Sequence, residues 1–278
     1  MLKKFRSVTE RHAIPASFIV FVLFEVLILG LGQLLSLMPE TLPLNFLSEV
    51  ILMVVPMAIV FLFGFSRTFK KGNFLKGLLC ALPFLALQLF ILAFFFFDNI
   101  GNPDASWKQW YWIAFGVFRI IGVGVREECF YRATIQNILA KKYANSMKGI
   151  WLTVIISSVI FGLCHVSNLL FGMDIIAVLI QVLVAMPCGL LFGAVYLRSG
   201  SIWAVILLHS FTDLASLAKS TFLNVDQIVD ANKLAFAWPS LIMCLAYAGL
   251  AIFLLRPSKL KEIRKNFCFL DKQSSKNI

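Results

Sequence analysis

Long apolar runs separated by short polar segments are the dominant pattern of this chain. Eight runs approach the ~20 residues that an α-helix needs to cross the ~30 Å hydrocarbon core of a bilayer. The ~10-residue alternation of barrel strands is missing from them, and only helices and closed barrels satisfy every backbone group in lipid. The pattern predicts an all-α, polytopic membrane bundle of about eight transmembrane helices, at residues 14–38, 45–65, 75–97, 108–130, 150–169, 174–197, 201–217 and 234–255.

Composition supports a membrane protein. The chain is 60% hydrophobic and 14% charged, whereas soluble domains carry about 25% charged residues. We expect one membrane domain over residues 1–278, with a basic cytoplasmic tail at 256–278. The first apolar run follows four basic residues as in a secretory signal, but it is long and has no small-residue cleavage site. It is therefore interpreted as a retained span.

The basic residues predict the orientation of the bundle. The net charge is +11, and 19 of the 25 Lys and Arg residues lie in the segments that alternate onto one side together with both termini, against three on the other side. Cytoplasmic loops carry such an excess, so we expect a multi-pass cell membrane protein with cytoplasmic N- and C-termini. Because these residues lie between apolar runs, they indicate contact with anionic lipid and no nucleic-acid partner.

The fourth run differs from the others because its helical pattern continues past the membrane to about Lys142. A helix of roughly 34 residues is about 50 Å long. We expect its end to project into the cytoplasm.

Ionisable side chains are costly inside a bilayer, so each one is a candidate for function. In the fourth run, Glu128 and Arg132 are spaced i, i+4 and can pair on one helix face, while Glu127 points about 100° away. The alternative is a salt-bridged helix end without chemistry. Glu25 and Glu49, in the first two runs, have no motif around them and are interpreted as structural or interfacial.

Two of the three histidines lie in separate apolar runs. His165 ends the segment that begins with Phe161, and His209 precedes Asp213 by four residues, which places both on one helix face. A hydrogen-bonded core histidine is the alternative interpretation of each. The fourth and fifth runs form a hairpin centred near residue 146, so Glu127 and His165 should lie at the same height, in a cavity that opens to the cytoplasm.

This combination suits hydrolysis of a peptide bond. A carboxylate and a histidine away from bulk water can activate a water molecule, and a second histidine with a polar neighbour can stabilise an oxyanion. Two histidines and two glutamates could also hold zinc, but the compact H-E-x-x-H signature is missing. We expect no cofactor, with zinc as the alternative. The six cysteines show no C-x-x-C pair and are interpreted as reduced apolar side chains; Cys129 and Cys164, next to the motifs, should tolerate alanine.

The ordered motifs resemble those of the CPBP intramembrane proteases, or Abi family, which include type II CAAX prenyl endopeptidases and bacterial proteins of bacteriocin processing and immunity. E-E-x-x-x-R, F-x-x-x-H and H-x-x-x-N/D are matched within about residues 110–217. The resemblance implies a glutamate-dependent endopeptidase in which Glu127 and His165 activate water and His209 and Asp213 line the oxyanion site. Supporting positions would be Glu128, Arg132 and Phe161. Aspartate stands where the eukaryotic enzymes have asparagine, so Asp213 would be protonated or would orient His209.

The resemblance leaves a second function class open. The expected enzyme cuts a peptide or a membrane-protein substrate near the cytoplasmic face, whether or not that substrate is prenylated. The alternative is a non-catalytic protein that binds another membrane protein and confers bacteriocin immunity. A transporter is a third alternative, but no inverted repeat or pair of broken helices supports it.

Overall fold

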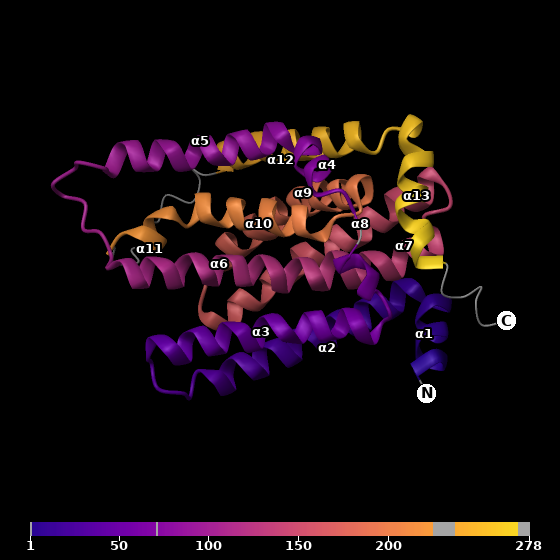
Figure 1. Cartoon of the computed structure of the whole chain (residues 1–278), viewed down its shortest axis with the longest axis horizontal. Helices are drawn as coiled ribbons and strands as arrows, with labels where there is room; N and C mark the ends of the chain where they lie inside the picture. The colour runs from indigo at the N-terminus through magenta and orange to yellow at the C-terminus, as the bar shows by residue number, and fades with distance from the viewer. Residues whose placement is uncertain (1, 71, 225–236, 272–278) are drawn as a thin grey trace.

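The described part of the chain is a bundle of helices joined by short loops (Figure 1). The structure is a computed structural model that describes residues 2–70, 72–224 and 237–271. Within these residues the only β-type pairing is a single bridge between Trp107 and Leu223, so the predicted all-α fold is confirmed. The α-helices are α1 (Leu2–Arg11), α2 (Ala13–Leu35), α3 (Leu42–Leu62), α4 (Phe74–Cys80), α5 (Leu82–Asn99), α6 (Trp110–Phe130), α7 (Asn137–Tyr143), α8 (Met147–Leu163), α9 (Ile175–Ser199), α10 (Ile202–Ser216), α11 (Ala218–Phe222), α12 (Ala237–Leu254) and α13 (Leu260–Asp271).

Five described segments are long and apolar enough to cross a membrane: α2, α3, α5, α9, and α8 with the 3₁₀ turns that follow it to Phe171. A sixth exists if Leu241–Leu254 and Pro257–Asn266, bent by 53°, count as one span. The predicted multi-pass bundle is confirmed, but not its count of eight. The start of the eighth predicted span, residues 234–236, lies outside the described residues. α10 has only 15 residues, and α6 carries four charged side chains in 21 residues.

The outer surface of the bundle is apolar. Val26 on α2 is 66% exposed and Phe97 on α5 is 86% exposed, and many other large aliphatic and aromatic side chains point outward. An apolar surface of this extent is costly in water and favourable against acyl chains. Lipid is therefore the solvent that this exterior fits.

The long charged helix is the centre of the bundle. α6, a π-helical turn at Tyr131–Gln136, and α7 form one continuous helix from Trp110 to Tyr143, which confirms the predicted extension. Thr134 Oγ1 donates to the carbonyl of Cys129, five residues earlier, at 3.1 Å, and π turns of this kind are common next to functional sites. Every residue from Glu128 to Ala140 is buried. The end of this helix is enclosed by α1, α2, α8 and α13, so it does not project freely as expected.

Polar side chains close the bundle around this enclosed end. Asn137 Nδ2 donates to Thr68 Oγ1 at 3.2 Å and to Tyr196 Oη at 3.0 Å. Gln136 Nε2 donates to the carbonyl of Gly193 at 3.0 Å. These bonds satisfy buried groups that would otherwise destabilise the core, and they join α7 to α9 and to the loop after α3.

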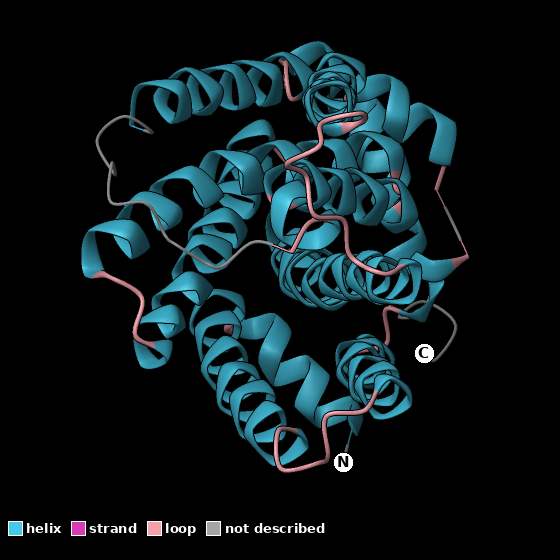
Figure 2. Cartoon of the chain, turned by 90° about the vertical axis from the view of Figure 1, so that its left-hand side faces the viewer, coloured by secondary structure: helices cyan, strands magenta, loops and turns pink. Residues whose placement is uncertain are grey.

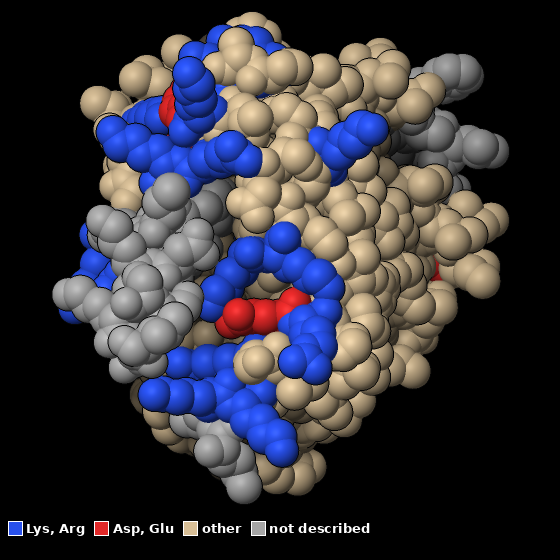
Figure 3. Space-filling view, turned by 90° about the vertical axis from the view of Figure 1, so that its right-hand side faces the viewer, with Lys and Arg blue, Asp and Glu red and all other residues tan. Residues whose placement is uncertain are grey.

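The terminal helices lie across the basic end of the bundle (Figure 1). Asn266 on α13 donates to the carbonyls of Leu197 and Arg198 at 2.8 and 2.9 Å, and thereby caps the C-terminus of α9. Arg198 contacts Glu262 at 3.2 Å, and Lys76 of α4 pairs with the same carboxylate. Figure 3 shows Lys and Arg side chains gathered on this face. The described part of the predicted tail is thus a docked helix.

We predict that Glu262 docks α13 only above acid pH. Burial raises the pKa of its carboxyl, but the hydrogen bond from Lys76 and the charges of Arg198 and Lys76 outweigh burial and lower the pKa below its ordinary value of 4.5. A carboxyl with a lowered folded-state pKa stabilises above its unfolded pKa, and the effect is lost as pH falls through the folded one. A nitroxide label on Lys261→Cys, in a chain with its native cysteines replaced, should therefore stay immobilised at pH 7 and gain mobility only below about pH 4.5.

The Glu262→Gln variant should show a mobile label across the whole pH range. Glu40→Gln, which changes an exposed carboxylate in the loop between α2 and α3, should behave as the parent chain does. Identical acid release with and without Glu262 would contradict the docking role.

Candidate active site

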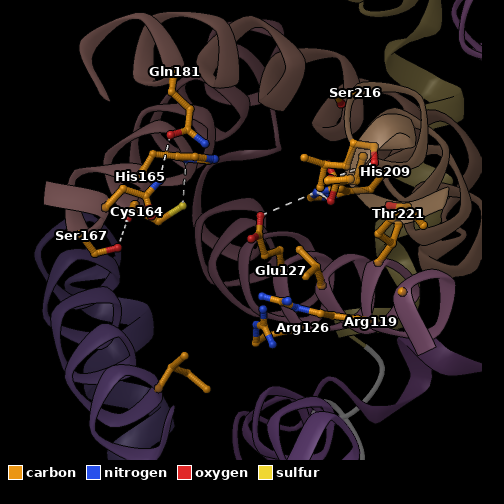
Figure 4. A pocket seen from close by; sticks show the side chains of 18 of the residues that line it. Arg119, Arg126, Glu127, Cys164, His165, Ser167, Gln181, His209, Ser216 and Thr221 are labelled. Atoms are coloured by element: carbon orange, nitrogen blue, oxygen red, sulfur yellow. Dashed lines mark hydrogen bonds and ion pairs between the residues drawn. The ribbon is translucent and has the colours of Figure 1, made fainter. Parts of the chain in front are cut away.

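A cavity of about 980 Å³ lies beside α6, between α2, α10 and the segment from the end of α8 into α9 (Figure 4). The structure brings four sequence-predicted residues to its wall: Glu127, His165, His209 and Asp213. Pockets of this size with few convergent polar groups are typical ligand sites.

Glu128 and Arg132 lie behind the cavity wall in the fully buried core, where both side chains are 0% exposed. Their i, i+4 spacing brings Arg132 Nε to 3.2 Å from Glu128 Oε2. The guanidinium also donates to Ser157 Oγ at 3.4 Å and lies 4.7 Å above the ring of Phe161. Arg132 therefore joins α6 to α8, and it balances the charge of Glu128 where no water can.

His209 is the centre of the polar contacts. Its Nδ1 lies 2.7 Å from Glu128 Oε1, while its Nε2 lies 3.4 Å from Asp213 Oδ2 and 3.7 Å from Glu127 Oε2. An ionised carboxylate only accepts hydrogen bonds, so the bond to Glu128 fixes a proton on Nδ1 and sets the plane of the ring. The Nε2 edge then faces the two carboxylates of the cavity wall.

A glycine makes this contact between helices possible. A Cβ at Gly124 would lie 2.7 Å from Ser210 Oγ and 3.1 Å from the carbonyl oxygen of Ile206, closer than Cβ contacts in real proteins normally come. Without a side chain at this position, the backbones of α6 and α10 approach closely enough for Glu128 to reach His209.

His165 lies on the far side of the cavity from Glu127 (Figure 4). It follows Cys164, where the α-helical winding of α8 changes to 3₁₀ winding. Its Nδ1 is 3.2 Å from Cys164 Sγ, and its ring packs edge-on against Phe161. In the described chain, no hydrogen bond or ion pair joins His165 to Glu127 directly. The two side chains share the cavity, as their equal height predicts, with space between them.

Sequence reasoning missed several residues of the cavity wall. Glu25 accepts a hydrogen bond from Tyr131 Oη at 2.9 Å, and both line the cavity with Arg119 and Arg126. The hydrogen bond agrees with the structural interpretation of Glu25, but its position on the cavity wall was not predicted. The sequence shows Glu25 as a single carboxylate in an apolar helix, but no motif around it indicated a position in the site.

The cavity leads away from the basic end of the bundle. Its wall continues through Lys108 and Trp112 to Ser220 and Asn224, at the end where α6 begins and α11 lies, opposite both termini (Figure 1). Figure 2 views the bundle from this end. The prediction that the cavity opens at the end that carries the termini is therefore wrong. The buried helical segment from Glu128 to Ala140 and α13, which crosses over it, fill that end.

Among the described residues, no group of three or more His, Cys, Asp and Glu side chains is arranged to hold a metal ion. Around His209 the carboxylates contact the imidazole itself.

We predict that the buried Glu128–Arg132 pair is needed for stability. Arg132→Met should lower the free energy of unfolding by about 3–5 kcal/mol, because it leaves Glu128 as an uncompensated buried charge. Glu128→Gln with Arg132→Met should lower it by less than the sum of the single changes, since both charges are gone. Reversible unfolding in mixed micelles measures these values.

Glu10→Gln is the matched control. It breaks an ion pair with Lys141 that is partly exposed, so it should cost no more than about 1 kcal/mol. Equal effects of Glu10→Gln and Arg132→Met would contradict the role of the buried pair.

Comparison with known proteins shows that part of the chain is similar to one protein family. Residues 108–215 match the family described as type II CAAX prenyl endopeptidase Rce1-like, a segment that includes all three motifs and agrees with the predicted 110–217. Neither the curated proteins nor the solved structures give a significant match. The resemblance to the CPBP intramembrane proteases is confirmed over residues 108–215.

Proposed function

We propose that the chain is an intramembrane endopeptidase that uses Glu127 to hydrolyse a peptide bond of a peptide or membrane-protein substrate. The observation that carries this proposal is the arrangement of Glu127, His209 and His165 around one cavity inside a membrane bundle. The family match over the same residues supports it. The bond would be cut inside the bundle, at the depth of Glu127.

The chemistry needs one water molecule between Glu127 and His165. The Glu127 carboxylate takes a proton from this water as the hydroxyl attacks the carbonyl carbon of the substrate. The proton then passes to the leaving amine as the C–N bond breaks. His165, on the opposite wall, holds the water by a second hydrogen bond. This role needs no direct contact between the two side chains.

His209 stabilises the oxyanion that forms during attack. With a proton on each nitrogen it donates from Nδ1 to Glu128 and offers Nε2–H to the cavity. A donor placed where negative charge develops contributes about 3–4 kcal/mol in comparable sites. An ionised Asp213, 3.4 Å from the same Nε2, cannot donate to an oxyanion. Its role is to keep His209 protonated and oriented.

The surroundings of the site complete the proposal. The bundle lies in the cell membrane with both termini in the cytoplasm, as the basic residues at the terminal end support (Figure 3). The reaction needs no metal and no nucleic-acid partner. The lipid bilayer covers the apolar exterior, and a membrane-protein substrate reaches the cavity within it.

We predict that Glu127 and His165 act together in one step, the activation of water. In purified protein with a pool of quenched fluorescent peptides that have apolar cores, Glu127→Gln and His165→Gln should each lower kcat about 10²–10⁴-fold. The double variant should lose little more than the worse single one, because residues that act on the same step are non-additive. Full activity of Glu127→Gln would contradict the proposal.

Cys164 provides the matched test of a thiol mechanism, because its Sγ lies 3.2 Å from His165 Nδ1. Its Sγ donates a hydrogen bond to the carbonyl oxygen of Phe161 at 2.9 Å, which only the neutral thiol can do, and a neutral thiol is a poor nucleophile. Cys164→Ala and the fully buried Cys129→Ala should retain kcat within about threefold, far less than the loss expected for a catalytic group. Loss of activity in Cys164→Ala with intact folding would assign the nucleophile to the thiol.

A further inference from the structure

Three cations on the cavity wall have no role in the hydrolysis described above. Lys108, Arg119 and Arg126 all line the cavity, and Figure 4 shows the two arginines projecting from α6 beside Glu127. Lys108 Nζ donates to the carbonyl oxygen of Ser220 at 2.5 Å. Guanidinium groups inside a bilayer are retained when they have partners or a function.

Both arginines contact one carboxylate. Glu49, a buried residue of α3, lies 3.7 Å from Arg126 Nη1 through Oε2 and 3.5 Å from Arg119 Nε through Oε1. It comes this close because Gly122 has no side chain: a Cβ there would lie 3.3 Å from Glu49 Oε2. Two positive charges share the negative charge of Glu49, and Glu25 of the same cavity also attracts Arg126. The surplus of positive charge on this wall therefore lies at Arg119.

Arg119 carries the accessible part of that surplus. Its side chain is 66% exposed, whereas that of Arg126 is 18% exposed. Within the described residues, its one ion pair uses Nε, which leaves the two terminal nitrogens of this cavity-lining side chain without an ion pair. This edge of a guanidinium matches a carboxylate with two parallel hydrogen bonds.

The position of Arg119 on α6 sets its distance from Glu127, where the peptide bond would be cut. It precedes Glu127 by eight residues in the same helix, which is about 12 Å along the axis. An extended peptide covers that distance in three or four residues. The direction from Glu127 to Arg119 is also the direction in which the cavity leads to Lys108.

We propose that Arg119 binds a carboxylate of the substrate three or four residues from the scissile bond, on the side toward the end of the bundle opposite both termini. This inference rests on the proposed endopeptidase function. Glu49 holds Arg119 in place and does not touch the substrate. Arg119 thereby determines specificity for an acidic peptide.

A peptide fits this subsite better than a lipid headgroup does. The other wall at this height comes from the end of α10 and α11, where Ser216, Ser220, Thr221 and Asn224 line the cavity. A Cβ at Gly116 would lie 3.1 Å from Thr221 Cγ2, so α11 is close to the helix that carries Arg119. The oxygens of these hydroxyl and amide groups can accept hydrogen bonds from a peptide backbone, whereas acyl chains offer no donors.

Binding of synthetic peptides tests the subsite separately from catalysis. The full chain with Glu127→Gln is placed in phosphatidylcholine nanodiscs, and the affinity of labelled, C-terminally amidated peptides with an apolar core is measured by fluorescence anisotropy. Peptides with one Glu should bind about 10-fold or more tightly than those with Gln, as expected for a charged hydrogen bond. Arg119→Gln should remove this difference and leave the affinity for the Gln peptides unchanged. Arg119→Lys should keep part of it, because lysine lacks the bidentate edge.

Lys219→Gln is the matched control, because it removes an exposed cation from the same end of the bundle without changing the cavity wall. It should leave the preference for Glu unchanged. Shifting the Glu along the peptide should give a maximum three or four residues from the bond cut by the parent enzyme. A peptide whose free C-terminal carboxylate lies at that spacing distinguishes a terminal from a side-chain carboxylate.

Two binding results would overturn this inference: no binding of any peptide, or an equal preference for Glu in Arg119→Gln. A third is loss of the preference for Glu when phosphatidylglycerol replaces phosphatidylcholine, because it would assign Arg119 to lipid. Failure of the proposed function looks different. In that case the Arg119-dependent preference persists, while no peptide is cleaved by the parent chain in a Glu127-dependent manner.

Discussion

Arg132 places a full positive charge in the centre of a membrane bundle, where neither water nor lipid headgroups can solvate it. The charge is tolerated because Glu128 pairs with it from the preceding turn of the same helix, and because Phe161 and Ser157 contact it from α8. Glu128 in turn holds His209 of α10. One buried charge thereby fixes three helices relative to one another, and the cavity wall depends on this arrangement.

The parts of the site that the sequence predicts are those set by local helical geometry. Residues four apart share a face, so the contact of Glu128 with Arg132 and that of His209 with Asp213 could be anticipated. The cost of charge in lipid also marked Glu127, His165, His209 and Asp213, which now line the cavity, but it did not single out Arg119 or Arg126. The hydrophobic pattern predicted the helices themselves, because lipid admits few alternatives.

The remaining features depend on contacts between helices that spacing does not encode. The bond from Glu128 to His209 needs the close approach at Gly124, and nothing in the sequence marks that glycine as a contact. The change to 3₁₀ winding at Cys164 places His165 across the cavity from Glu127. The tail was predicted as a basic cytoplasmic segment, but its described part includes α13, which packs over the end of α9 and closes the face where an opening was expected. Specific tertiary contacts outweigh composition in each case.

The central claim is that Glu127 makes this bundle a peptide hydrolase. The most direct measurement is quantitative proteomics of peptide termini in membranes of cells that express either the parent chain or Glu127→Gln at equal levels. The account predicts at least one pair of adjoining new termini that appears with the parent chain and not with Glu127→Gln. Identical sets of termini in the two membranes, with both proteins folded and abundant, would contradict it and favour a binding role for the bundle.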